Sequence, residues 1–101
     1  MHKLIALYHP PTDIAQFRRH LVSVHLPIVR RFPGLRTLQY SVEPAFATAT
    51  PSYAAIVECE FDSEATMQAA LASPAGAEAA ADVPNYASAG VTILTFAVQS
   101  L

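Results

Sequence analysis

The chain has 101 residues, of which 52% are hydrophobic and 14% are charged, and its formal net charge is −2. This length fits a single domain over residues 1–101, and so few charges predict that a second copy covers part of the apolar surface. Six Lys and Arg residues are too few for a nucleic-acid surface, and no apolar run is long enough to span a bilayer.

The first predicted element is a strand over residues 3–9, which ends at Pro10-Pro11. Alternate side chains face opposite ways: Leu4, Ala6 and Tyr8 on one side, and Ile5, Leu7 and His9 on the other. Both faces are therefore apolar, and a strand of this kind is covered on both sides.

A helix is predicted to begin at Asp13, which forms a capping-box pattern with Gln16. Apolar positions then recur at helical spacing through Ile14, Phe17, Leu21, His25 and Ile28. This stripe places His25 on the buried face. Because Pro27 cannot donate to the carbonyl of Ser23, we expect a kink or a break beside His25. A turn over residues 32–34 ends the segment.

The second half of the chain contains the remaining elements. Strands are predicted over residues 35–43, 53–61 and 91–98, with a loop over 44–52 that contains an exposed Phe46. Ser63 is predicted to cap a second helix, and Ser73-Pro74 to end it and start another. Residues 82–86 are predicted to form a turn.

This order of elements predicts an α+β, ferredoxin-like βαββαβ fold. Its four-stranded antiparallel sheet carries the helices on one face. The other face would be solvated in a monomer, yet the first and last strands are apolar there too. Two copies packed sheet to sheet would bury this face and form a dimeric α/β barrel.

Four stretches of the chain carry a resemblance to a known family. They are Leu7-Tyr8 through Pro11-Thr12-Asp13 to Phe17; His20 with Val24-His25-Leu26-Pro27 and Phe32-Pro33-Gly34-Leu35; Ser73-Pro74-Ala75-Gly76; and Asp82-Val83-Pro84-Asn85-Tyr86. Together they resemble the EthD family, named for ethyl tert-butyl ether degradation, of the dimeric α/β-barrel superfamily. The resemblance implies a homodimer and a role in degradative or aromatic polyketide pathways.

His25 is the predicted catalytic residue. It lies on an otherwise apolar stripe, and an imidazole there can act as general acid or base near neutral pH. In the alternative interpretation, His25 is a buried structural residue bonded to the backbone carbonyl that Pro27 leaves free. His20 is a second candidate. It lies five residues away, so the two rings do not share a helical face as i, i+4 residues would, but both could flank one cavity. The alternative for His20 is a helix flank or an interface.

The predicted ligand-binding residues are the aromatic and polar side chains expected around the pocket, together with the apolar residues that shape it. Tyrosines could donate a hydrogen bond to a carbonyl or phenol, or simply pack in the sheet. His9 would approach the pocket mouth if its strand face meets the helices, and the dimer seam if it does not. The set is Tyr8, His9, Phe17, Leu21, Tyr53 and Tyr86.

Several chemistries lack a supporting pattern. There is no His-x-x-x-His or Cys/His pair for a metal, no histidine follows His25 where related barrels hold haem, and no glycine-rich loop could bind a nucleotide. Cys59 has no partner for an internal disulfide and reads as an inert core residue, and residues 1–8 do not match a signal peptide. We therefore expect a cytoplasmic protein without a cofactor.

The leading functional hypothesis is a cofactor-free enzyme acting on a small apolar or aromatic molecule. His25 would transfer a proton in an isomerisation, cyclisation, dehydration or decarboxylation, while His20 or a tyrosine polarises an oxygen. The alternatives are a non-catalytic accessory protein that sequesters a hydrophobic intermediate, and a dimeric scaffold whose pocket is filled by side chains.

Overall fold

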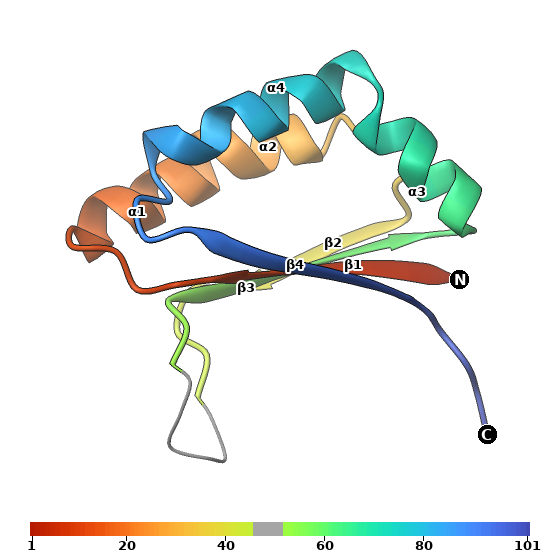
Figure 1. The fold of residues 1–101 in the computed structure, drawn as a ribbon, viewed down its shortest axis with the longest axis horizontal. Coiled ribbons are helices and arrows are strands. Elements are labelled where there is room, and N and C mark those ends of the chain that lie inside the picture. Colours follow the sequence, from red (N-terminus) through yellow and green to blue (C-terminus); the bar gives the residue numbers. More distant parts are fainter. Residues whose placement is uncertain (46–51) are drawn as a thin grey trace.

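The structure, a computed structural model, describes residues 1–45 and 52–101. These residues form two layers, a twisted antiparallel sheet and a helical layer that covers one of its faces (Figure 1). Most of the predicted loop over 44–52, including Phe46, lies outside the described residues. In the described part of the chain, no helix is both long and apolar enough to cross a membrane.

The sheet has the strand order β2-β3-β1-β4, and every neighbouring pair is antiparallel. Its strands are β1 (His2–Tyr8), β2 (Thr37–Ser41), β3 (Ala55–Phe61) and β4 (Val91–Ala97). The two central strands are therefore β1 and β3, which confirms the ferredoxin-like arrangement predicted from the order of elements. The predicted strands 35–43 and 53–61 each prove shorter at the side of the loop between them.

The helical layer consists of two antiparallel arms above the sheet (Figure 1). The first arm comprises α1 (Ile14–His20), η1 (Leu21–His25) and α2 (Leu26–Val29). The second comprises α3 (Glu64–Leu71), α4 (Pro74–Asp82) and η2 (Val83–Asn85). Residues 82–86 are not the simple turn that we predicted, because Asp82 still belongs to α4 and the next three residues form a 3-10 turn.

The predicted helix starts are confirmed by their side-chain caps. The Asp13 carboxylate accepts a hydrogen bond from the Gln16 backbone N–H at 3.0 Å. The hydroxyls of Ser63 and Ser73 each accept one from the backbone N–H three residues ahead, at 3.1 and 3.2 Å. Each cap satisfies an N–H that the first helical turn leaves without a partner, so local sequence alone fixes where α1, α3 and α4 begin.

We predicted a kink or a break beside His25, and the first helical arm does not break at Pro27. The segment before it, η1, is a π-helix, in which the Leu26 N–H donates to the Leu21 carbonyl five residues earlier. Proline removes one intrahelical donor and crowds the preceding turn. A single wider turn absorbs this disturbance, and the helix continues through α2.

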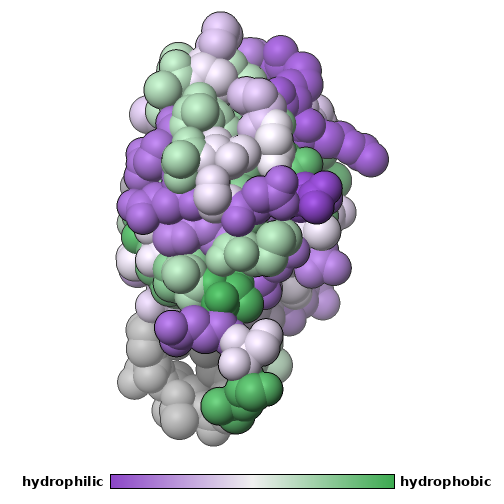
Figure 2. All heavy atoms as spheres, turned by 90° about the vertical axis from the view of Figure 1, so that its right-hand side faces the viewer, coloured by the Kyte–Doolittle hydropathy of each residue, from purple (hydrophilic) through white to green (hydrophobic). Residues whose placement is uncertain are grey.

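The two faces of the sheet differ in what covers them. Leu4, Ala6 and Tyr8 face the helices and are buried. On the opposite face, hereafter the open face, Leu94 pairs with Ile5 and is 41% exposed, and Phe96 is 39% exposed. Figure 2 shows the end of the molecule near α3 and the two termini, where polar and apolar residues are mixed. The exposed apolar side chains of β4 thus lie along the sheet, where a second copy was expected.

Candidate active site

One carboxylate, that of Asp82, joins the two helical arms. His20 Nε2 lies 2.8 Å from Oδ1 and 3.0 Å from Oδ2 of Asp82. His25 Nδ1 lies 3.0 Å from Oδ2, and the Asn85 side-chain amide donates to Oδ1 at 3.0 Å. Because a carboxylate only accepts, each ring nitrogen that faces it carries the hydrogen. Asp82 thereby fixes the position of both histidines.

The π-helical turn explains why both histidines reach the same carboxylate. We expected residues five apart to diverge, since an α-helix aligns i with i+3 and i+4. In a π-helix the hydrogen bond runs from i to i+5, and η1 spans the interval between His20 and His25. The expectation that the two rings do not share a helical face was therefore wrong, because it assumed α-helical geometry.

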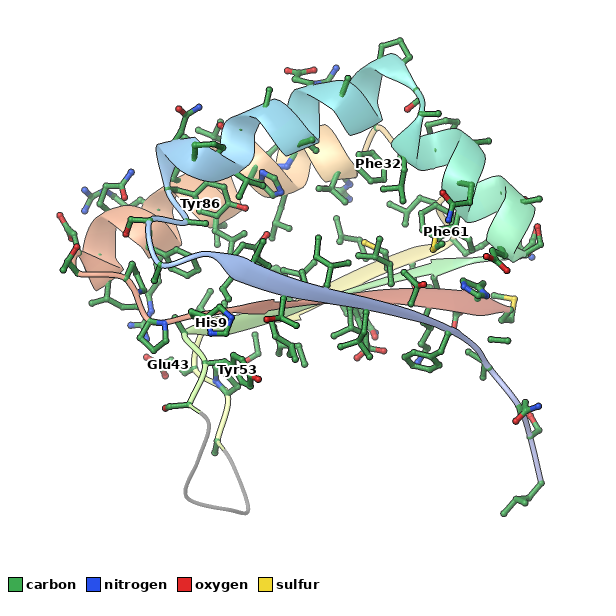
Figure 3. All side chains as sticks on the ribbon, viewed as in Figure 1. His9, Phe32, Glu43, Tyr53, Phe61 and Tyr86 are labelled. Atoms are coloured by element: carbon green, nitrogen blue, oxygen red, sulfur yellow. The ribbon has the colours of Figure 1, made fainter. Side chains whose placement is uncertain are left out.

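Aromatic rings hold the histidines from the other side. The Tyr86 ring stacks on His20, with centroids 4.9 Å apart and planes at 12°, and its centroid is also 4.9 Å from that of His25. Its hydroxyl lies 2.7 Å from the hydroxyl of Tyr8. Phe17 packs edge-on against Tyr8 at 5.4 Å. Figure 3 shows Tyr86 lying beneath the helices at the end of the second arm.

A cavity of about 130 Å³ lies between the sheet and the two helical arms. His25 and Tyr8 line it, and neither Lys, Arg, Asp nor Glu does. Its apolar wall comes from both layers, including Leu4, Val29, Phe32, Val57, Ala79 and Val83. Ile93 also lines it and is 56% exposed, which puts the mouth of the cavity at the edge strand β4.

A larger hollow of about 660 Å³ lies elsewhere, along the other edge strand β2. Its wall includes Arg30, Arg31 and Arg36, and none of the predicted site residues. Size alone would make it the favoured site. We favour the smaller cavity, since its mostly apolar wall contains the ionisable side chain of His25.

The protonation states follow from burial and from the shared carboxylate. Burial lowers the pKa of His25 below its ordinary value, although the hydrogen bond and charge of Asp82 oppose this. Burial would raise the pKa of Asp82, but the hydrogen bonds from Asn85, His20 and His25 outweigh it and the pKa is lowered. Burial raises the pKa of Tyr8 and of Tyr86. At neutral pH, Asp82 is therefore ionised, His25 neutral and both tyrosines protonated.

Nε2 of His25 is consequently the basic atom of the site. Nδ1 carries the hydrogen that Asp82 accepts, so Nε2 of the neutral ring holds a lone pair. No hydrogen bond between described residues uses Nε2. The alternative in which His25 bonds the carbonyl freed by Pro27 is not the arrangement found, because its protein partner is the Asp82 side chain.

The structure brings some of the predicted site residues together and separates others. His20, His25, Tyr8 and Tyr86 form one connected group, and Phe17 packs against it. Leu21 is fully buried in the core but does not line the cavity.

His9 and Tyr53 lie apart from the cavity. His9 Nε2 bonds the hydroxyl of Thr92 at 2.8 Å, and Thr92 pairs with Leu7 on the open face. The rings of His9 and Tyr53 are 5.5 Å apart, and Figure 3 shows both near Glu43, at the end of the sheet where the 44–52 loop leaves it.

Sequence reasoning missed Asp82 and Asn85 as site residues. Their stretch, 82–86, was noted only for its resemblance to a family motif and as a turn. Asp82 is 7% exposed, and an acidic residue this deeply buried requires partners. A usable signal was its position three residues after Ala79, on the helix side that packs inward, whereas Glu78 of the same helix is exposed.

The fold and this site define a class: a ferredoxin-like α+β protein with a histidine-lined cavity under the helices. The model of the EthD domain matches residues 9–90. The chain belongs to the EthD family, as its four motif stretches indicated.

Individual relatives agree with this assignment. The chain is 37% identical over 94 residues to an uncharacterized 11.0 kDa protein of the thcB-thcC intergenic region of Rhodococcus erythropolis, covering 93% of this chain and 91% of that one. The crystal structure of an ethyl tert-butyl ether degradation (EthD) family protein from Bacillus halodurans superposes with a TM-score of 0.88 at 26% identity, covering 98% and 99% of the two chains. A dimeric ferredoxin-like protein of unknown function from Thermobifida fusca gives a TM-score of 0.74 at 18% identity, covering 96% and 90%.

Proposed function

We propose that this protein is a cofactor-free enzyme in which His25 transfers a proton on a small apolar or aromatic molecule. One observation carries the proposal: His25 lines a cavity whose other lining residues are mostly apolar, while its Nδ1 is bonded to Asp82. From this we infer that the free Nε2 of the ring is available to a molecule in the cavity. Burial lowers the pKa of His25, so the ring is neutral at physiological pH and can accept a proton.

The proposed reaction begins with one proton transfer. Nε2 of His25 removes a proton from a carbon next to a carbonyl. The C–H electron pair becomes a second bond between that carbon and the carbonyl carbon, so that negative charge develops on the oxygen. Tyr8 also lines the cavity, and in this proposal its hydroxyl donates a hydrogen bond to that oxygen. The imidazolium then returns the proton to another atom. Isomerisation, cyclisation, dehydration and decarboxylation share this enolate-forming or enolate-consuming step.

Asp82 and His20 act as positioning residues in this proposal. The Asp82 carboxylate stabilises the imidazolium that forms on His25, and it keeps the ring in the tautomer that leaves Nε2 free. His20 bonds both oxygens of the same carboxylate and so restricts its rotation. General acid–base catalysis of this kind contributes about 10²–10⁴-fold to a rate.

We further propose that the protein works in the cytoplasm as a homodimer in a degradative or polyketide-type pathway. The open face supports the dimer, because Leu94 and Phe96 are exposed there beside half-buried Ile5 and Leu7. The same face carries the Lys3–Glu58 ion pair, and exposed apolar side chains grouped on a sheet face often mark an interface. Relatives of the same fold are described as dimeric.

The experiment uses a substrate that needs no knowledge of the pathway. Exchange of the α-protons of cyclohexanone in D₂O is followed by NMR with the wild-type protein and with His25→Gln. Wild-type protein should accelerate exchange, and His25→Gln should reduce the acceleration by about 10²-fold or more. The matched control is His9→Gln, which changes a histidine outside the cavity and should exchange at the wild-type rate. Equal rates for wild type and His25→Gln would refute the catalytic role.

The second candidate is a non-catalytic protein that sequesters a hydrophobic intermediate. It is favoured by the absence of charged side chains from the cavity wall, since such a wall binds apolar molecules without activating them. In that case the wild-type protein would bind ring compounds without accelerating exchange. His25→Gln would then leave their affinity nearly unchanged.

A further inference from the structure

We infer that the cavity takes an uncharged, single-ring molecule with one hydroxyl group, a phenol or a cyclic enol, which donates to His25 Nε2 and accepts from the Tyr8 hydroxyl. This inference rests on the proposed binding site but not on the proposed catalysis. It names the ligand class through volume, charge and the match of hydrogen-bond donors to acceptors.

The space between the sheet and the helices has room for one ring. An apolar cavity of about 150 Å³ holds a benzene molecule, and the cavity beneath these helices measures about 130 Å³. Its walls are well packed on the inner side, where Leu4 and Val57 are buried in the sheet. A second fused ring would have to project through the mouth at Ile93.

The charge of the wall excludes an anion. No Lys or Arg side chain lines the cavity, and the nearest charge is the Asp82 carboxylate, which His25 shields and three donors already occupy. A ligand carboxylate there would lose its hydration without gaining a cationic partner, which is strongly unfavourable. Arg30, Arg31 and Arg36 line the other hollow, at β2.

The hydrogen-bond inventory favours a bound hydroxyl over an ether, because an ether cannot donate to His25 Nε2. A ketone substrate offers Nε2 the proton on its α-carbon instead. The tautomer of His25 makes Nε2 an acceptor, so the ligand must supply a donor. Tyr8 and Tyr86 share one hydrogen bond, which uses one of their two hydroxyl hydrogens. Either hydroxyl can be the donor of this bond. Because Tyr8 lines the cavity and Tyr86 does not, our inference requires that Tyr86 donates to Tyr8, which leaves the Tyr8 O–H for the ligand. A single hydroxyl satisfies both groups, because it donates once and accepts once.

The same arrangement suits the proposed reaction. An enol forms when the imidazolium of His25 passes the abstracted proton to the enolate oxygen. Nε2 is then neutral again and can accept a hydrogen bond from the enol O–H. A phenol mimics this enol with a planar ring and a hydroxyl of similar geometry. Binding of phenols can therefore be measured whether or not the protein is catalytic.

The test compares two isomers of identical composition, p-cresol and anisole, of which only p-cresol donates a hydrogen bond. Affinities are measured by calorimetry and by NMR titration at pH 7.5, together with those of benzoate and 2-naphthol. We expect p-cresol to bind about ten-fold or more tightly than anisole, because anisole leaves Nε2 unpaired. Benzoate and 2-naphthol should each bind at least ten-fold more weakly than p-cresol.

Two further measurements connect the preference to the named atoms. Tyr8→Phe should lower the affinity for p-cresol to near that of anisole, whereas the control Tyr53→Phe, outside the cavity, should retain the preference. In the wild-type protein, the ¹⁵N resonance of His25 Nε2 should shift when p-cresol binds and stay in place with anisole. This signal needs no substitution, so it remains informative if Tyr8→Phe fails to fold.

The outcomes separate the ligand class from the catalytic proposal. Preference for p-cresol without any α-proton exchange would support the ligand class and refute catalysis. Equal affinity for the two isomers, tighter binding of benzoate, or an unchanged Nε2 resonance would overturn the ligand class, even if exchange is observed.

Discussion

Replacing Asp82 with asparagine tests the arrangement on which the site depends. Three donors converge on the carboxylate, from His20, His25 and Asn85. An amide offers one oxygen instead of two and presents N–H groups where the second oxygen stood. At least one buried donor then loses its acceptor, or a histidine changes tautomer to accept from the new amide.

The expected loss of stability can be worked from these contacts. Hydrogen bonds to charged groups contribute about 1.5–3 kcal/mol each, and an unsatisfied buried donor adds a comparable penalty. Losing one such bond and weakening the others should lower the free energy of unfolding by about 2–4 kcal/mol. For a domain of this size that corresponds to a fall in Tm of roughly 10–25 °C.

The assay is urea unfolding of wild type and Asp82→Asn at one protein concentration, because the proposed dimerisation would make stability depend on concentration. The matched control is Asp62→Asn. Asp62 pairs with Arg36 at 2.9 Å, but both side chains are about 60% exposed, so its loss should cost less than about 1 kcal/mol. The ¹⁵N spectrum of Asp82→Asn should show the hydrogen of His25 redistributed toward Nε2, with α-proton exchange slowed by about 10²-fold or more.

Two results would refute this reasoning. If Asp82→Asn were no less stable than Asp62→Asn, the carboxylate would not be holding the helical arms together. If the His25 resonances kept the wild-type tautomer, Asp82 would not set the protonation of Nδ1.

Three further predictions address the rest of the structure. Burial lowers the pKa of His25 below 6.5, so the unfolded state binds a proton on this ring more readily than the folded state. The free energy of unfolding should therefore rise with pH from the folded pKa to about 6.5 and then level off. In urea titrations between pH 5 and 8, His25→Gln should flatten that rise. A Cβ at Gly76 would collide with the carbonyl oxygens of Ala70 and Leu71, so Gly76→Ala should destabilise the folded protein by about 1–3 kcal/mol in thermal unfolding. The control Ala77→Ser, on the exposed side of α4, should change the stability by less than about 0.5 kcal/mol. Equal effects would contradict the close packing of α3 against α4. Leu94→Asp puts a charge on the open face and should sediment as a monomer at concentrations where wild type and the helix-surface control Gln68→Asp are dimers; a monomeric wild type would refute the proposed dimer.

Local patterns in the sequence were sufficient to predict the architecture. The alternation in the strands, the capping residues Asp13, Ser63 and Ser73, and the order of elements gave the layers and the topology that the structure shows. These features are determined by residues a few positions apart, through backbone hydrogen bonds and side-chain alternation. The burial of His25 follows from the same kind of periodicity.

The site itself was decided by tertiary structure. Asp82 meets His20 and His25 across 62 and 57 residues of chain, and no local pattern pairs residues at that separation. The π turn in η1 adds one residue to the helical turn and so changes the direction in which the following side chains point. As a result His20 and His25 both reach the Asp82 carboxylate, which α-helical spacing would not allow. Which atom of His25 stays free depends on that contact. The sequence therefore determined that a histidine is buried beneath the helices, while packing between the arms determined its partner, its tautomer and the cavity it faces.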